Sequence, residues 1–386
     1  MTTSRAIFFI TGVSAFVIYA LTLAPSITWR NNGVDSGDLA TAVAVGGVPH
    51  PPGYPTYLVL GEIFKLLPFG DVAYRLNLLS ATSAALSSAI LALVIYQTLA
   101  AVAGGQKPGH GAGPTVSWLS AVCAISASLT LAFSGLFWSQ AVIAEVYALN
   151  ALFAAGLLYG ALQVKPANQS WLVPALFGLL GLSLGNHLSI LLIVPLIIWL
   201  LKSEWRWPLV VTSCLAFGLG LSIYLIIPIR AAALPPVNWG AATNWPNFWW
   251  LVSAEAYRSL LLALPWQFIP TRLAVLAGLL AEVFIWWGLP VSLLGLQRLL
   301  RLNYSLGLAS LLTLLLFAIY AIGYNTTDSY IYLLPALLML SLWLGWGLFD
   351  VGHTLRELLG DKPYADTLIA GGLVCLPLLS LWLNFS

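Results

Sequence analysis

The sequence predicts an all-α, polytopic membrane protein, and three observations lead to that prediction. Of the 386 residues, 60% are hydrophobic and only 7% are Asp, Glu, Lys or Arg. The mean hydropathy is +0.93. The apolar runs are long and continuous, which suits helices that cross a bilayer rather than the alternating pattern of a barrel strand. The net charge of +2 gives no indication of nucleic-acid binding.

Hydrophobic windows of about 20 residues predict about eleven membrane-spanning helices within one integral domain, residues 1–386. The predicted spans cover residues 6–23, 74–103, 118–137, 147–164, 171–184, 188–201, 208–227, 273–296, 304–322, 331–349 and 367–383. The first run lacks a convincing small-residue cleavage site, so we interpret it as a retained span. Residues 57–67 are too few to cross and predict an interfacial or re-entrant helix.

Basic residues in the loops between the spans favour a cytoplasmic N-terminus. This orientation places nine of them inside: Arg5, Lys107, Lys165, Lys202, Arg206, Arg298, Arg301, Arg356 and Lys362. It places the others outside: Arg30, Lys65, Arg75, Arg230, Arg258 and Arg272. Two long loops, residues 24–71 and 228–271, then face the extracytoplasmic side of a bacterial inner membrane or an ER-type membrane. Loops of this length are commonly functional.

The first outer loop holds two carboxylates and a histidine close together in a chain with few charges. Asp35 and Asp38 are three residues apart, so they share a face if the segment is helical. A short helix is expected to continue to Gly46, capped by Asp35 or Ser36 and with Asp38 in its first turn. Capping accounts for one acid but not for the pair beside His50. Ionisable groups at membrane depth are candidates for function.

The second outer loop is rich in tryptophan, at Trp239, Trp245, Trp249, Trp250 and Trp266. Two interpretations stay open. The tryptophans form an aromatic belt at the lipid headgroups, or they form a half-inserted lid over a lipid-linked substrate.

Four more polar residues lie at the outer ends of predicted spans, and each also has a simpler interpretation. Glu145 suits a solvated cap, and His187 suits a histidine that satisfies buried backbone groups. Arg230 suits an arginine that snorkels to the headgroups, although its guanidinium also matches a phosphate. Asp328 suits a helix cap. The predicted topology places all four on the side of Asp35, and we expect them to converge on one cavity.

These motifs resemble the GT-C glycosyltransferases, and more narrowly the transmembrane protein O-mannosyltransferases related to vertebrate transmembrane protein 260. The resemblance begins with Asp35-Ser36-Gly37-Asp38-Leu39 and Gly47-Val48-Pro49-His50-Pro51-Pro52-Gly53-Tyr54-Pro55. It continues with Glu145-Val146-Tyr147-Ala148-Leu149-Asn150, Gly185-Asn186-His187, Pro228-Ile229-Arg230 and Val237-Asn238-Trp239-Gly240. It covers roughly the first two-thirds of the chain strongly and the last third weakly.

The resemblance implies an enzyme that takes a sugar, with mannose as the first candidate, from a polyprenyl-phosphate donor on the extracytoplasmic face. The acidic catalytic residue of the first outer loop maps to Asp35 or Asp38. The residues expected to bind donor or acceptor are His50, Tyr54, Glu145, Asn150, His187, Arg230, Trp239 and Asp328. Animal relatives carry an additional C-terminal lumenal region that this chain lacks, so protein, lipid and glycan acceptors all stay open.

Inverting transfer suits these residues chemically, because one carboxylate takes the acceptor's hydroxyl proton as the oxygen attacks the anomeric carbon. Asp35 is the first choice for the base and Asp38 the second. No metal-ligand spacing is present, although a divalent cation bridging Asp35 and Glu145 is an alternative. The competing functions are a transporter or flippase for a lipid-linked precursor, which Glu282 inside a predicted span favours, and a structural scaffold. Against transport, the polar groups gather at one face rather than at the midplane.

Overall fold

The computed structural model describes residues 2–104, 114–164, 171–204, 206–360 and 362–385, and the regular structure of these residues is helical. The first half contains α1 (Thr3–Leu21), η1 (Arg30–Asn32), α2 (Ser36–Val45), α3 (Pro55–Lys65), α4 (Val72–Gly104), α5 (Pro114–Ala132), α6 (Gly135–Ala141), α7 (Tyr147–Gln163), α8 (Leu172–Leu184), η2 (Leu188–Ile193) and α9 (Val194–Leu200).

The second half begins with α10 (Trp207–Leu221), η3 (Ser222–Leu225), α11 (Ile226–Ala232), η4 (Trp239–Ala241), α12 (Trp245–Val252), η5 (Glu255–Leu260) and η6 (Trp266–Phe268). It ends with α13 (Ile269–Val283), α14 (Gly288–Leu302), α15 (Tyr304–Gly323), η7 (Ser329–Leu333), α16 (Leu334–Leu359) and α17 (Ala365–Asn384).

Within the described residues, six helical segments are long and apolar enough to cross a membrane, and eight are if each of two bent pairs forms one span. The all-α, polytopic prediction is therefore confirmed. Reaching the predicted count of about eleven requires three shorter apolar segments as well, Tyr147–Gln163, Leu172–Leu184 and Leu188–Leu200. The predicted interfacial segment, residues 57–67, lies in α3, which has 11 residues.

Two predicted spans are wrong as continuous helices. The segment predicted at residues 273–296 is broken between α13 and α14, which meet at 90°. Pro290 lies in the first turn of α14, where its missing N–H is tolerated, whereas inside a continuous helix it would remove a hydrogen bond and favour a kink. The segment predicted at residues 118–137 is likewise bent by 70° between α5 and α6. Ser134 there adopts an extended conformation as the N-cap of α6.

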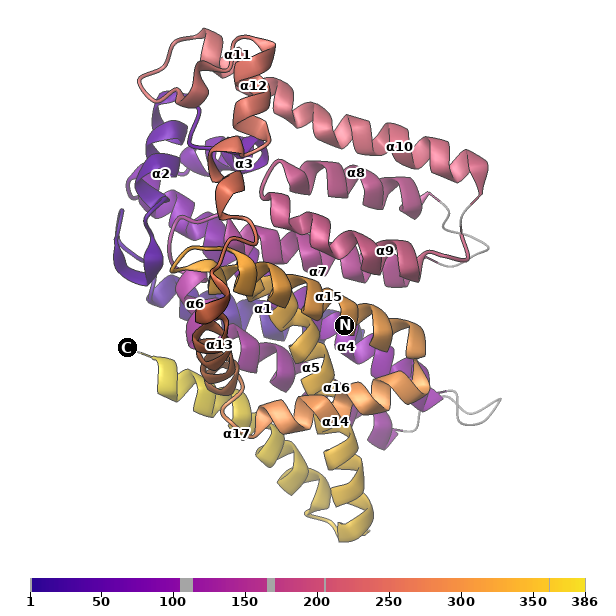
Figure 1. Cartoon of the computed structure of the whole chain (residues 1–386). Coiled ribbons are helices and arrows are strands. Elements are labelled where there is room, and N and C mark those ends of the chain that lie inside the picture. The colour runs from indigo at the N-terminus through magenta and orange to yellow at the C-terminus, as the bar shows by residue number, and fades with distance from the viewer. Residues whose placement is uncertain (1, 105–113, 165–170, 205, 361, 386) are drawn as a thin grey trace.

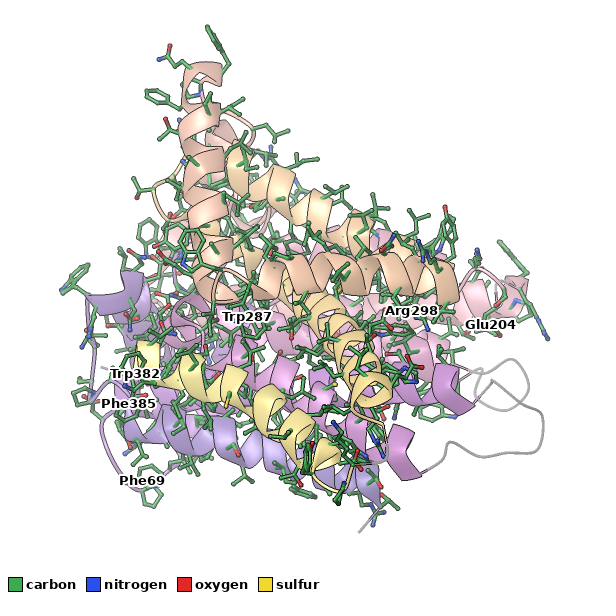
Figure 2. The ribbon with its side chains drawn as sticks, turned by 90° about the horizontal axis from the view of Figure 1, so that it is seen from below. Phe69, Glu204, Trp287, Arg298, Trp382 and Phe385 are labelled. Carbon is green, nitrogen blue, oxygen red and sulfur yellow. The ribbon has the colours of Figure 1, made fainter. Side chains whose placement is uncertain are left out.

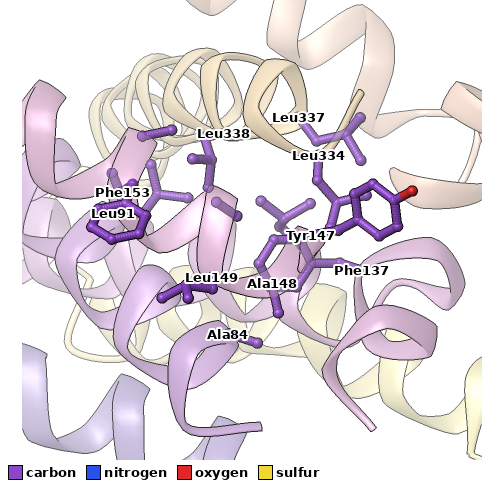
Figure 3. Close-up of a cluster of buried hydrophobic side chains, with 14 of the residues drawn as sticks. Ala84, Leu91, Phe137, Tyr147, Ala148, Leu149, Phe153, Leu334, Leu337 and Leu338 are labelled. Carbon is purple, nitrogen blue, oxygen red and sulfur yellow. The ribbon is translucent and has the colours of Figure 1, made fainter. Parts of the chain in front are cut away.

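The core is built around α16, α4, α5 and α7, which pack against one another. The most apolar stretch of the η7–α16 segment is 94% buried. Figure 3 shows Leu334, Leu337 and Leu338 of α16 against Tyr147 and Phe153 of α7. By contrast, the most apolar stretches of α1, of the α10–α11 segment and of α17 are only 17–28% buried. The exposed side chains of these helices are largely apolar. A bilayer is the solvent that suits such surfaces.

The two long loops, residues 24–71 and 228–271, meet at one corner of the molecule. Figure 1 shows α2 and α3 of the first loop close to α11 and α12 of the second. The backbone joins them directly, because Val48 donates its N–H to Val237 and accepts an N–H from Trp239, at 2.9 and 3.1 Å. This parallel bridge pairs Val48 with Asn238. The candidate residues of both loops are therefore brought together.

Labelled residues near the ends of several helices fall into two groups at opposite sides of the molecule. In Figure 2, Phe69, Trp382 and Phe385 lie at one end, and Glu204 and Arg298 lie at the other. The topology predicted from the basic residues assigns the same two groups to opposite sides. Lys107 and Lys165, which the prediction also used, lie outside the described residues.

Candidate functional site

The helix predicted after Asp35 is α2. Asp38 lies in its first turn, where the helix dipole stabilises negative charge. Leu39, Ala42 and Val43 are fully buried along one face, as the helical spacing predicts. Asp35 occupies the N-cap position, yet its side chain makes no capping hydrogen bond. The Asp35 carboxylate is therefore free of a purely structural role at the helix end.

The His50–Tyr54 turn is fixed by its backbone. The Gly53 N–H donates to the His50 carbonyl at 2.9 Å. Gly53 has φ +86, and a Cβ there would lie 3.1 Å from the Leu251 side chain. Glycine alone suits both the conformation and the close approach of α12. The turn therefore holds the His50 imidazole in a defined place.

Asp38 is held by three donors. Its Oδ2 accepts from the His50 backbone N–H at 2.9 Å and lies 2.6 Å from His50 Nδ1. Its Oδ1 accepts from Trp239 Nε1 at 3.2 Å. Burial opposes the charge of Asp38, but these hydrogen bonds and the charge of His50 prevail and lower its pKa. Asp38 is thus an ionised anchor that joins α2, the His50 turn and the second outer loop.

His50 bridges the two carboxylates. Its Nε2 lies 3.4 Å from Asp35 Oδ2 and 3.1 Å from the Tyr54 hydroxyl. Burial favours the neutral ring, but hydrogen bonds to Asp35 and Asp38 outweigh it and raise the pKa of His50 to about 9. At neutral pH the ring is an imidazolium, and its positive charge lies beside the Asp35 carboxylate.

Asp35 reaches a cavity of about 200 Å³. The Asp35 side chain is 42% exposed, whereas the Asp38 side chain is 23% exposed. Six tyrosines surround the cavity: Tyr54, Tyr147, Tyr257, Tyr320, Tyr324 and Tyr332. The other lining residues are His50, Pro51, Pro52, His187, Leu188, Ala254, Leu260, Thr326 and Asp328. Aromatic faces with hydroxyl edges suit a sugar, which offers C–H faces and hydroxyl groups.

Glu145 lies in the connection between α6 and α7 and is 2% exposed. Neither carboxylate oxygen has a hydrogen-bond partner. Burial, and then the neighbouring charge of Asp35, raise the pKa of Glu145 well above its ordinary value. Burial thus favours the protonated form of Glu145 behind the cavity wall.

Of the remaining predicted site residues, His187 and Asp328 also line the cavity. Asp328 is the N-cap of η7, but its side chain makes no capping hydrogen bond. Asn150 is buried behind the cavity and donates to Ser189 Oγ at 3.2 Å. Trp239 acts through Asp38. The predicted convergence therefore includes most of these residues.

Arg230 lies apart from the cavity lining. Its Nη2 pairs with Glu62 Oε1 at 2.9 Å, and its Nη1 donates to the Gly47 carbonyl at 3.2 Å. The side chain is 11% exposed. The snorkelling interpretation does not describe it either, because the guanidinium faces α3 and the end of α2. Sequence reasoning missed Glu62 as its partner.

Sequence reasoning also missed the tyrosines contributed by the last third of the chain. Tyr320 lies in the last turn of α15, and Tyr324 is the C-cap residue that follows the helix. Their rings both pack against Tyr332, at centroid distances of 5.2 and 5.3 Å. The spacing of these tyrosines beside Asp328 was the available signal.

Within the described residues, no group of three or more His, Cys, Asp or Glu side chains could hold a metal ion. Asp35 and Glu145 are the pair suggested for a bridging cation. The unpartnered oxygens of Glu145 are the one observation that favours a cation there, and its deep burial equally suits a proton.

Comparison with known proteins gives this site a family context. Residues 35–210 match the family described as the protein O-mannosyl-transferase TMEM260 N-terminal domain. Protein O-mannosyl-transferase TMEM260 of Mus musculus is 33% identical over 264 residues, which cover 65% of this chain and 34% of the mouse protein. The Dictyostelium discoideum protein of the same name is 26% identical over 327 residues, covering 76% of this chain and 36% of that protein. The chain resembles the TMEM260 protein O-mannosyl-transferases. It spans about a third of the length of these relatives.

Solved structures place the TMEM260-like chain on the GT-C fold. ArnT from Cupriavidus metallidurans bound to undecaprenyl phosphate has a TM-score of 0.57 at 14% identity, covering 100% of this chain and 71% of ArnT. The apo state of ArnT has a TM-score of 0.61 at 14% identity, covering 99% of this chain and 76% of ArnT. The apo Archaeoglobus fulgidus oligosaccharyltransferase has a TM-score of 0.56 at 12% identity, covering 99% of this chain and 55% of that protein. At these identities the likeness shows the fold, and the GT-C resemblance predicted from the motifs is confirmed.

Proposed function

We propose that this protein is an inverting membrane glycosyltransferase that moves a sugar from a polyprenyl-phosphate donor to an acceptor hydroxyl, with Asp35 as the general base. The observation that carries the proposal is the contrast within one turn of α2. Asp38 is occupied by three donors, whereas Asp35 faces the tyrosine-lined cavity with one shared histidine. A base must have a carboxylate oxygen that an acceptor hydroxyl can reach.

The reaction balances with the groups in place. Asp35 takes the proton of the acceptor hydroxyl while the oxygen attacks the anomeric carbon. The bond between that carbon and the phosphate oxygen breaks, and the polyprenyl phosphate leaves with the electron pair. The imidazolium of His50, whose Nε2 lies 3.4 Å from Asp35 Oδ2, orients this carboxylate before the attack.

A second cavity supports a lipid-linked donor. It encloses about 410 Å³ between α13 and the α15–η7 region, with a lining that is mostly apolar. It is separated from the tyrosine-lined cavity by residues 325–328, which contribute to both. Arg272 stands at this border, donating to the Thr326 carbonyl at 2.8 Å and to Ser329 Oγ. We assign the isoprenoid chain to this second cavity and the phosphate to its Arg272 end.

The orientation and the acceptor extend the same proposal. The basic residues of the loops support an extracytoplasmic cavity and about eleven spans, with the shorter apolar helices crossing beside the long ones. The names of the relatives support mannose as the sugar and a protein hydroxyl as the acceptor. Transport has less support, because Glu282, its best argument, is exposed at the C-terminal end of α13 beside the bend.

The direct test is donor choice by the purified wild-type protein. Polyprenyl-phosphate mannose should support transfer to a Ser- and Thr-containing peptide or to a lipid or glycan acceptor, with inversion at the anomeric carbon. Nucleotide-linked mannose without lipid carrier should support none. Asp35→Asn is the matched negative control. Transfer from the nucleotide sugar alone, or translocation of the donor without transfer, would overturn the proposal.

A further inference from the structure

A buried hydrogen-bond chain ends at the cavity in His187. The Asn150 amide donates to Ser189 Oγ at 3.2 Å, and Ser189 Oγ lies 2.7 Å from His187 Nδ1. The Ser189 backbone N–H also donates to His187 Nδ1, at 3.2 Å, which makes His187 the cap of η2. Asn150, His187 and Ser189 are all buried. The chain therefore runs from the interior of α7 to the cavity wall.

The backbone contact fixes the tautomer of the ring. A backbone N–H only donates, so Nδ1 must accept and carry no proton. The neutral ring then carries its proton on Nε2. Burial lowers the pKa of His187 to about 4, with the nearby Asp35 opposing and His50 adding to that effect. The ring is neutral at physiological pH, and Nε2 is a hydrogen-bond donor without charge.

Two tyrosines hold the ring in place at the cavity. The centroid of His187 lies 5.6 Å from that of Tyr147 and 5.5 Å from that of Tyr332, and all three residues line the cavity with Asp35. The ring cannot rotate away without losing both the Ser189 cap and these two aromatic contacts. Nε2 is the ring nitrogen that no described protein group occupies.

We propose that His187 reads one hydroxyl group of the transferred sugar through its Nε2–H, and that Ser189 and Asn150 are positioning residues that hold the ring in this tautomer. The inference rests on the proposed function and names a specificity determinant within it. A neutral donor suits a sugar hydroxyl better than a departing phosphate, which a cation stabilises.

The test combines deoxy donors with a substitution that preserves the cap. Polyprenyl-phosphate mannose and its 2-, 3-, 4- and 6-deoxy analogues are compared by kcat/KM. A site built to bind a hydroxyl rejects the analogue that lacks it, so the wild type should lose about 10²-fold or more with one analogue. His187→Asn keeps an oxygen that accepts the Ser189 N–H, but it lacks the Nε2–H. With the full donor, the kcat/KM of this variant should fall to the value that the wild type shows with that deoxy analogue. With the analogue itself, the variant and the wild type should have the same kcat/KM.

Two further variants distinguish recognition of the sugar hydroxyl by His187 from a structural role of this residue. Ser189→Ala keeps the backbone cap but removes the link to Asn150, so it should raise KM for the full donor and leave the deoxy donor unaffected. His353→Gln, on the exposed part of α16, is the control and should change neither. Equal losses on all donors would show a purely structural role for His187 and overturn the inference. If the wild type transfers from no polyprenyl donor, the proposed function fails as well.

Discussion

Two charged clusters lie at opposite ends of α2, within the two long loops, and they use their charges in opposite ways. The carboxylate–histidine cluster contains Asp35, Asp38 and His50. The arginine clamp contains Glu62, Lys65 and Arg230. In the clamp, Glu62 Oε1 pairs with Arg230 at 2.9 Å and Oε2 pairs with Lys65 at 2.5 Å. Both cations also donate to backbone carbonyls at the C-terminal end of α2. Every charged group of the clamp is occupied by the protein.

The carboxylate–histidine cluster differs at one group. Asp38 is as well occupied as the clamp, but Asp35 keeps a 42% exposed side chain at a cavity. The clamp and Asp38 together hold α2 at its two ends, against α3, α11 and the second outer loop. Charges that are fully paired thus fix the position of α2, and the charge left available performs the proposed chemistry.

Substitution of the two aspartates should give opposite patterns. Asp35→Asn removes the base and should lower the transfer rate by about 10²-fold or more. It should cost less stability than Asp38→Asn, because Asp35 makes one contact with His50 and Asp38 makes two. Asp38→Asn breaks charge-assisted hydrogen bonds to His50 and should cost about 1.5–3 kcal/mol of stability. Its rate should fall less than that of Asp35→Asn. Both are measured by turnover and by thermal unfolding in detergent.

Glu255→Gln, an exposed acid of the second outer loop, is the control for both aspartates and should match the wild type. The division between base and anchor is wrong if Asp38→Asn abolishes turnover while Asp35→Asn retains it. In that case the second choice made from the sequence is the base.

The stability of the protein should depend on pH through His50. The folded pKa of about 9 exceeds the ordinary value of 6.5, so the stabilisation is complete below about 6.5 and is lost as pH rises through about 9. A shift of this size corresponds to about 3 kcal/mol. Wild-type protein should therefore lose stability between pH 6.5 and 9.5, measured by thermal unfolding. His50→Asn should be less stable at pH 6.5 and should lack this loss. A wild-type curve that is flat over this range contradicts the imidazolium.

Much of the local structure around the two charged clusters was predictable from residue spacing. The α2 helix, its buried face, the position of Asp38 in its first turn and the separate α3 all follow from local patterns. The pairing of Arg230 with Glu62 was not predictable, because the two residues are 168 positions apart and only the folded chain shows their contact. The bend between α13 and α14 was missed because hydropathy alone does not distinguish a straight span from a broken one.

The candidate site was predictable in the same uneven way. Asp35, His50, His187 and Asp328 were selected because charged and ionisable residues are rare in this chain, and Tyr54 was selected from the motif resemblance. All five line the cavity. Tyrosines are not rare in it, so Tyr257, Tyr320, Tyr324 and Tyr332 gave no comparable signal. The neutral tautomer of His187 depends on a backbone N–H two residues away, which no spacing rule reveals.

Glu145 tests whether the proposed cluster works without a metal. As a buried neutral acid it resembles glutamine in shape and polarity, so Glu145→Gln should keep activity near that of the wild type. Glu145→Ala leaves a cavity behind Asp35, and a small misplacement of the base should cost about 10-fold in rate. EDTA should leave the wild-type rate unchanged. If Glu145→Gln is as inactive as Asp35→Asn, and EDTA inhibits until a divalent cation is added back, a cation bridges the two carboxylates.

The smallest expected effect belongs to Arg230, which the sequence assigned to the donor phosphate. In the clamp its partners are Glu62 and the Gly47 carbonyl, so Arg230→Lys should lower the melting temperature slightly and change KM for the donor by no more than about twofold. Arg272 stands where the two cavities meet, and lysine does not reproduce the bidentate fork of a guanidinium. Arg272→Lys should therefore raise KM for the donor, by about 10-fold. The measurement is the donor-concentration dependence of turnover in both variants. If KM for the donor rises with Arg230→Lys and not with Arg272→Lys, Arg230 binds the donor phosphate and the arginine clamp is part of the donor-binding site.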